Sequence, residues 1–211
     1  MLEWIAVITM FIDHVGYKFF PDDLTWRMFG RLAFPIYTYL VVRGLNFTKN
    51  KVNYFKRLIF LALLSQVPFM LLFEVNSLNV IFTLMYSAFA IIVYEKVNRK
   101  LWGIIILNCM AIIMIPVNDY MDYGLYGYIL FLLYYFLNKN AYLLMAGHIF
   151  LNVLYSNYYF GSWYSIQSFS ILATLLIILK AHLPNIKISR LFYRSFYPTH
   201  LIILYIIYGL N

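Results

Sequence analysis

Two neighbouring side chains in the first apolar segment of this 211-residue chain are of types that do acid–base chemistry. Asp13 and His14 lie within the apolar run 3–20. An imidazole has an ordinary pKa near 6.5, so His14 is a candidate general base. Asp13 would orient His14 through another group or neutralise a cation. The structural alternative pairs Asp13 with Arg31 and holds His14 by a hydrogen bond.

Two arginines follow in the next apolar run. Arg27 and Arg31 are four residues apart and share one face of a helix. A charge at hydrocarbon depth costs about 2.5–3.5 kcal/mol on insertion scales, so Arg31 is a candidate member of the catalytic group. Gly30 would allow a close helix contact, and Pro35 would kink the helix beside a cavity. In the alternative, Arg27 reaches the headgroups and Arg31 only pairs with Asp13.

Three uncharged polar side chains are expected at a similar depth. Gln66 precedes Val67-Pro68, and Asn79 begins an apolar run that carries Thr83 one turn later. Amides and hydroxyls at this depth either join helices or donate to a developing oxyanion or an acceptor. The sequence favours neither role.

Basic residues and a late histidine suggest where a charged donor would enter. Arg43 and Arg57 lie in a basic segment, which either sets topology and attracts anionic lipid or binds a phosphorylated cytosolic donor. Tyr197 and His200 flank Pro198, which suits a first helical turn. That register puts His200 one turn inside the membrane, where Tyr197 and His200 would shape the donor entrance.

Composition indicates which elements position these residues. The chain is 64% hydrophobic and 11% charged, against roughly 25% charged in soluble domains. We therefore predict an all-α, polytopic membrane helix bundle of about nine transmembrane helices, in one domain over 1–211 of a multi-pass cell-membrane protein. The predicted spans are 3–20, 27–45, 57–73, 78–95, 101–117, 123–138, 141–156, 163–181 and 195–210.

The positive charges fall on alternate connections between these spans. The segments 43–57, 95–100, 138–140 and 180–194 hold 13 of the 16 lysines and arginines. The other connections hold only Lys18, Arg27 and Arg31. This bias places the N-terminus in the cytoplasm and the C-terminus outside. It also accounts for the net charge of +8 without nucleic acid.

The chain offers little for metal or disulfide chemistry. Cys109 is the one cysteine, and the four histidines are scattered, so no metal site is expected. The bilayer is the expected surrounding, and a homo-oligomer is compatible with the sequence.

Six blocks in order along the chain resemble the TraX family of membrane acetyltransferases, known for acetylating the N-terminus of conjugative F pilin. Arg43-Gly44 departs from the family, in which an acidic residue often precedes the glycine. The matching blocks are Ile12-Asp13-His14, Gly30-Arg31-Leu32-Ala33-Phe34-Pro35-Ile36, Ser65-Gln66-Val67-Pro68-Phe69, Leu78-Asn79-Val80-Ile81-Phe82-Thr83-Leu84, Tyr123-Gly124-Leu125-Tyr126-Gly127 and Phe196-Tyr197-Pro198-Thr199-His200.

The family is also similar to the wider membrane acyltransferases, such as the lysosomal heparan N-acetyltransferase. The resemblance implies a cytosolic acetyl-CoA donor, an acceptor reached from the other membrane face and a buried histidine. His14 would then act as base, with Asp13 and Arg31 around it. The acceptor is an amine or hydroxyl of a peptide, a glycan or a lipid-linked molecule.

Two other classes of function are alternatives to an enzyme. A transporter or flippase of a small polar solute or lipid-linked intermediate would also use a kinked helix, although no inverted repeat is visible. A non-catalytic membrane scaffold would have no need for Asp13, His14 and Arg31 at depth.

Overall fold

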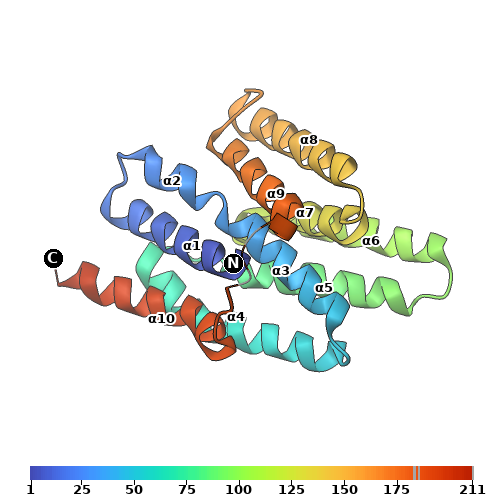
Figure 1. Ribbon diagram of the computed structural model, residues 1–211, viewed down its shortest axis with the longest axis horizontal. Coiled ribbons are helices and arrows are strands. Elements are labelled where there is room, and N and C mark those ends of the chain that lie inside the picture. Colours follow the sequence, from blue (N-terminus) through green and yellow to red (C-terminus); the bar gives the residue numbers. More distant parts are fainter. Residues whose placement is uncertain (183, 185, 211) are drawn as a thin grey trace.

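The chain folds into an all-α bundle, as predicted (Figure 1). The computed structural model describes residues 1–182, 184 and 186–210, and these contain no β-strand. Three short 3₁₀ helices, η1 Ile115–Tyr120, η2 Ile166–Phe169 and η3 Leu179–His182, adjoin the α-helices. The α-helices are α1 Leu2–Phe19, α2 Leu24–Gly30, α3 Ala33–Phe47, α4 Lys51–Phe73, α5 Val80–Lys96, α6 Lys100–Met114, α7 Gly124–Leu137, α8 Ala141–Phe160, α9 Ser170–Ile178 and α10 Arg190–Gly209.

Two of the predicted spans differ from the helices in a way that affects the site. The run 27–45 is not one kinked helix, because α2 ends at Gly30 and α3 begins at Ala33. Pro35 lies in the first turn of α3, where a missing N–H costs nothing. The last helix begins at Arg190, well before the predicted 195, so Pro198 lies inside it. Hydropathy detects the apolar part of a helix and misses its polar first turns.

Four helices begin at a residue whose side chain accepts a hydrogen bond from a backbone N–H of the same helix. Asp23 accepts from the backbone N–H of Thr25 to begin α2. Asn50, Asn79 and Asn140 do the same for α4, α5 and α8. Such caps satisfy N–H groups that have no partner within the helix.

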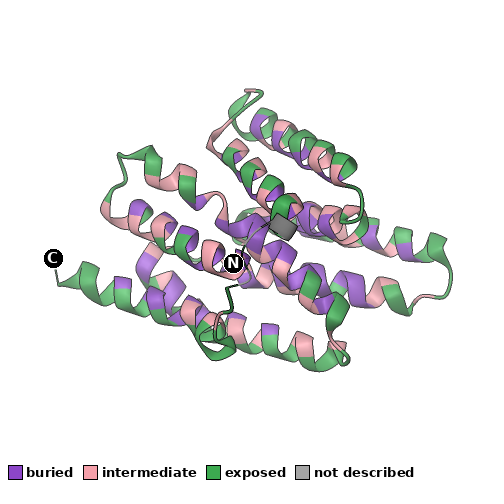
Figure 2. Ribbon diagram, viewed as in Figure 1, coloured by how far each residue is buried: buried purple, intermediate pink, exposed green. Residues whose placement is uncertain are grey.

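Three helices form the centre of the bundle. α3, α5 and α7 contact one another, and the buried residues concentrate there (Figure 2). Ile36, Ile91 and Phe131 are fully buried at this junction. α8 and α9 cover one side of the centre, and α1, α4 and α10 lie on another (Figure 1). The cavity described below lies between this second group and the centre.

Connections that were predicted on one side of the membrane contact one another. Lys18 pairs with Glu74, Leu78 bridges to Met121, and Asn118 donates to Tyr159. The bundle therefore has one end made by the connections after α1, α4, α6 and α8.

The other predicted group of connections meets at the opposite end. Lys51 pairs with Glu95, and the N-terminal amine donates to the carbonyl of Ile186. Arg43 reaches Glu3 at the start of α1 at 4.0 Å. The alternation of charge along the sequence thus corresponds to two physical ends of the bundle.

Two helical stretches among the described residues are long and apolar enough to cross a bilayer. They are Lys51–Phe73 and Lys100–Tyr120. Many large apolar side chains on the outer faces of helices are exposed, among them Leu101, Ile112 and Phe150.

The packing predicts that one methyl group added at Gly127 would lower the stability of the fold. A Cβ there would lie 2.8 Å from Phe34 Cζ and 2.8 Å from Thr83 Cγ2, at the junction of α3, α5 and α7. Gly127→Ala should therefore destabilise the protein by about 1–3 kcal/mol. Gly209→Ala is the control, because nothing lies within 4 Å of its Cβ. Thermal unfolding in detergent measures both, and equal unfolding temperatures would contradict this packing.

Candidate functional site

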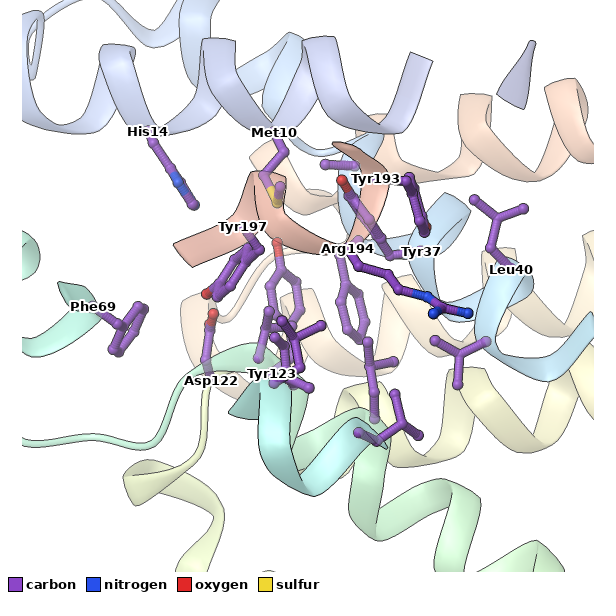
Figure 3. A pocket seen from close by; sticks show the side chains of 18 of the residues that line it. Met10, His14, Tyr37, Leu40, Phe69, Asp122, Tyr123, Tyr193, Arg194 and Tyr197 are labelled. Carbon is purple, nitrogen blue, oxygen red and sulfur yellow. The ribbon is translucent and has the colours of Figure 1, made fainter. Parts of the chain in front are cut away.

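A cavity of about 830 Å³ runs between α1, α3, α4 and α10. Its lining is mainly apolar, and most of its charged side chains fall into two groups. One end, the ion-pair end, carries Asp13, Arg27 and Arg31. The other end, the arginine end, carries Arg57 together with Arg190 and Arg194 of α10. Figure 3 shows side chains that line the cavity. Cavities for small molecules typically measure about 300–1,000 Å³, so this one is large enough for a cofactor-sized ligand.

The ion-pair end is organised by one carboxylate. Asp13 Oδ1 lies 2.9 Å from Arg27 Nη1, and both carboxylate oxygens lie 3.0 Å from Arg31 Nη2. Arg31 Nη1 also donates to Gln167 at 3.2 Å. The chain achieves this closeness through Gly30, where a Cβ would lie 2.0 Å from Asp13 Oδ1. The pairing of Asp13 with Arg31 that the structural alternative described is therefore present, and Asp13 neutralises Arg27 as well.

The partner of His14, which the sequence did not identify, is His200. His14 Nδ1 lies 2.8 Å from Nε2 of His200, and the planes of the two rings are nearly parallel, at an angle of 13°. Because α10 begins at Arg190, His200 lies halfway along the helix, at the depth of His14. The register that put it one turn inside the membrane was wrong for this reason.

The hydrogen bonds of the pair determine which ring nitrogens carry protons. A carbonyl oxygen only accepts, so His200 Nδ1 donates to the Phe196 carbonyl, 2.7 Å away. A neutral His200 therefore accepts at Nε2, and His14 donates from Nδ1. His14 Nε2 is left with a lone pair, and the side chain of His14 lines the cavity (Figure 3). This arrangement equips His14 to remove a proton from a ligand.

The arginine end holds guanidinium groups that no carboxylate neutralises. Within the described part of the chain, Arg57, Arg190 and Arg194 form no ion pair. Arg57 lies 5.6 Å from the ring centroid of Tyr54, which also lines the cavity. Unneutralised guanidinium groups around a cavity mouth suit an anionic ligand such as a phosphate.

A backbone bridge holds two further residues over the cavity. Leu78 donates to the Tyr120 carbonyl at 2.8 Å and accepts from the backbone N–H of Asp122 at 3.0 Å. Tyr123 follows with φ of 64°, a left-handed conformation that is unusual for a tyrosine. Its ring stacks on Phe34 with centroids 3.8 Å apart. Both Asp122 and Tyr123 line the cavity.

Gln66, Asn79 and Thr83 lie behind the cavity wall and support this bridge. Gln66 donates to Ser77 at 2.9 Å and accepts from Asn79. Asn79 also donates to the Ala62 carbonyl, and Thr83 donates to the Asp122 carbonyl at 2.6 Å. None of the three lines the cavity. Two roles were possible for these side chains, and the observed contacts are those of side chains that join helices.

The structure separates the residues expected at the donor entrance. Arg57 lies at the arginine end of the cavity, whereas Arg43 faces outward beside Glu3. Tyr197 lines the cavity next to the histidine pair, 6.2 Å between ring centroids from His14.

Sequence reasoning did not assign a site role to several residues of the cavity. From the sequence, Arg190 and Arg194 were interpreted only as charges of a connection between spans, although their spacing of four residues puts them on one helix face. One feature of the sequence could have indicated a site role for Asp122: it is an acidic residue directly before Tyr123-Gly124, where a predicted span begins. Tyr37 lines the cavity from the second turn of α3, and nothing in its sequence context marks it.

Comparison with known proteins places the chain by its sequence. The family model described as TraX protein matches residues 1–208. No curated protein and no solved structure matches the chain.

The cavity predicts a pH-dependent stability effect at Asp122, which lies in the connection before α7. Burial raises the pKa of Asp122 to about 6, from the ordinary 3.8. The folded protein therefore holds this proton more tightly than the unfolded chain, and stability falls as pH rises from about 4 to about 6. Asp122→Asn should raise the unfolding temperature relative to the natural protein above pH 6, with the gain shrinking towards pH 4. A gain that stays constant over this range would contradict the assignment.

Proposed function

The chain belongs to the TraX family, and from that premise we propose that it is a multi-pass membrane acetyltransferase. It transfers an acetyl group from cytosolic acetyl-CoA to an amine or hydroxyl of a second substrate. The observation that carries this proposal is the single cavity that joins unneutralised arginines at one end to a histidine pair near the other.

Placement in the membrane is supported by the outer surface and the two ends of the bundle. Large exposed apolar side chains suit lipid, and two helical stretches meet the length and hydropathy of a membrane span. The arginine end belongs to the connections that are rich in lysine and arginine, which favour the cytoplasmic side. The other helices are shorter or less apolar, so in this proposal they cross as parts of the packed bundle.

Donor binding follows from the charge of the arginine end. Arg57, Arg190 and Arg194 would bind the phosphates of acetyl-CoA, since guanidinium groups form strong, often bidentate hydrogen bonds with phosphate oxygens. The apolar middle of the cavity would take the pantetheine arm, and this arm would carry the thioester towards His14. Arg43 has no part in this account, because it lies outside the cavity next to Glu3.

Transfer follows from the protonation of the histidine pair. His14 Nε2 takes the proton of the acceptor amine or hydroxyl as its nitrogen or oxygen attacks the thioester carbonyl carbon. The new bond forms, the carbonyl electrons move to oxygen, and their return breaks the carbon–sulfur bond. The proton on His14 then passes to the departing thiolate. His200 accepts from His14 Nδ1 throughout, which stabilises the transient imidazolium.

The first test of this proposal is removal of the base. His14→Ala should lower the transfer rate from labelled acetyl-CoA by about 10²–10⁴-fold, the usual contribution of a general base. His200→Ala should lower the rate less and shift its pH profile, because His14 keeps its lone pair but loses its orienting partner. Both variants are checked for folding by thermal unfolding. Near-normal turnover by folded His14→Ala protein would remove His14 from the mechanism.

A second test addresses the donor end. Arg194→Gln should raise the KM for acetyl-CoA about tenfold with little change in kcat, since one charge-assisted contact to phosphate is lost. Arg99→Gln is the matched control, because Arg99 is an exposed arginine of another basic connection and does not line the cavity. Equal KM values in the two variants would place the donor elsewhere.

A further inference from the structure

One tyrosine hydroxyl beside the histidine pair has no hydrogen-bond partner although it is buried. Tyr197 is only 6% exposed, and its Oη finds no partner within the described residues. Leaving a buried hydroxyl unsatisfied destabilises a fold, so native structures rarely do it. An orphaned donor on a cavity wall indicates a group that a ligand supplies.

The same fold satisfies buried tyrosine hydroxyls away from the cavity. Tyr128 donates to the Leu107 carbonyl at 2.8 Å, and Tyr134 bonds Thr174 at 2.7 Å. Tyr126 bonds both His148 and Ser170 at 3.1 Å. None of these three tyrosines lines the cavity, whereas Tyr197 does. The lack of a hydrogen-bond partner for the Tyr197 hydroxyl is therefore a feature of its position on the cavity wall.

The neighbours of Tyr197 place its ring beside the proposed base. Its ring meets His14 and His200 edge-on, with centroids 6.2 and 5.7 Å apart. Figure 3 shows the Tyr197 side chain pointing into the cavity towards Asp122. Among the described residues, Tyr37 carries a second buried hydroxyl without a partner on the cavity wall, but its ring stacks on Tyr193, in the part of the cavity towards Arg194.

We propose that the Tyr197 hydroxyl donates a hydrogen bond to the carbonyl oxygen of the acyl donor and stabilises the oxyanion that forms there. The proposal rests on the proposed function and supplies the oxyanion donor that Gln66, Asn79 and Thr83 do not provide. A hydroxyl fixed by ring packing is already oriented before the reaction, which is the condition for strong transition-state stabilisation. Tyr197 is thus a catalytic residue of the transfer.

The step involves no transfer of the tyrosine proton. As the acceptor nitrogen or oxygen bonds to the carbonyl carbon, its proton goes to His14 Nε2 and the carbonyl electrons become the lone pair on oxygen. Tyr197 Oη keeps its proton and donates more strongly to the negative oxygen. When the carbonyl forms again, the carbon–sulfur bond breaks and the thiolate receives the proton from His14.

Tyr197→Phe tests this role, because it removes the hydroxyl and leaves the ring. We expect kcat for acetyl-CoA-dependent transfer to fall about 10²–10³-fold, as when one oxyanion donor is lost, with the KM for acetyl-CoA nearly unchanged. The unfolding temperature should stay the same or rise, since no bond is lost. Tyr128→Phe is the control and should show the reverse, a lower unfolding temperature with unchanged kcat.

A ligand comparison tests the same contact without turnover. The natural protein should bind acetyl-CoA more tightly than S-ethyl-CoA, which lacks the carbonyl oxygen, and Tyr197→Phe should lose most of this preference. A natural protein that neither binds nor uses acetyl-CoA would refute the proposed function itself. An active natural protein whose Tyr197→Phe variant keeps both kcat and the ligand preference would overturn the assignment of Tyr197 alone.

Discussion

The arrangement of the site depends on one carboxylate that neutralises two guanidinium groups inside an apolar bundle. Asp13 contacts Arg27 and Arg31 at 2.9–3.0 Å, and it is only 9% exposed. Removing one partner of a buried ion pair typically costs about 3–5 kcal/mol, because the remaining charge stays buried. This cluster therefore requires Gly30 at the contact, and it ties α1 to the break between α2 and α3. His14, next to Asp13 in the chain, is presented to the cavity as a consequence.

The remaining geometry comes from contacts between distant segments. The Leu78–Met121 bridge, supported by Gln66, Asn79 and Thr83, holds Asp122 and Tyr123 at the cavity. α10 brings Tyr197 and His200 against α1, and its first two turns bring Arg190 and Arg194 to the opposite end. One helix thus contributes to both ends of the cavity, which makes the distance between them a fixed property of the fold.

Much of this could be predicted from the sequence, and the failures have identifiable causes. The helical class, the Asp13–Arg31 pair and the close contact at Gly30 follow from the cost of charge in apolar surroundings and from residue size. The His14–His200 contact spans 186 positions, so no local spacing reveals it. The hydropathy pattern also predicted a start for the last helix that is too late, so His200 was predicted too near the beginning of that helix. The roles of Asn79 and Thr83 were undecided because amides and hydroxyls serve helix contacts and ligands equally well.

The proposed function requires that one ligand occupies the whole cavity, with its phosphates at the arginine end and its thioester at the histidine pair. A cryo-EM or crystal structure of the protein with acetyl-CoA would show whether it does. We expect phosphate density beside Arg57, Arg190 and Arg194, and a thioester carbonyl between His14 Nε2 and Tyr197 Oη. Phosphate density at another surface, with the cavity filled by lipid, would refute this binding mode.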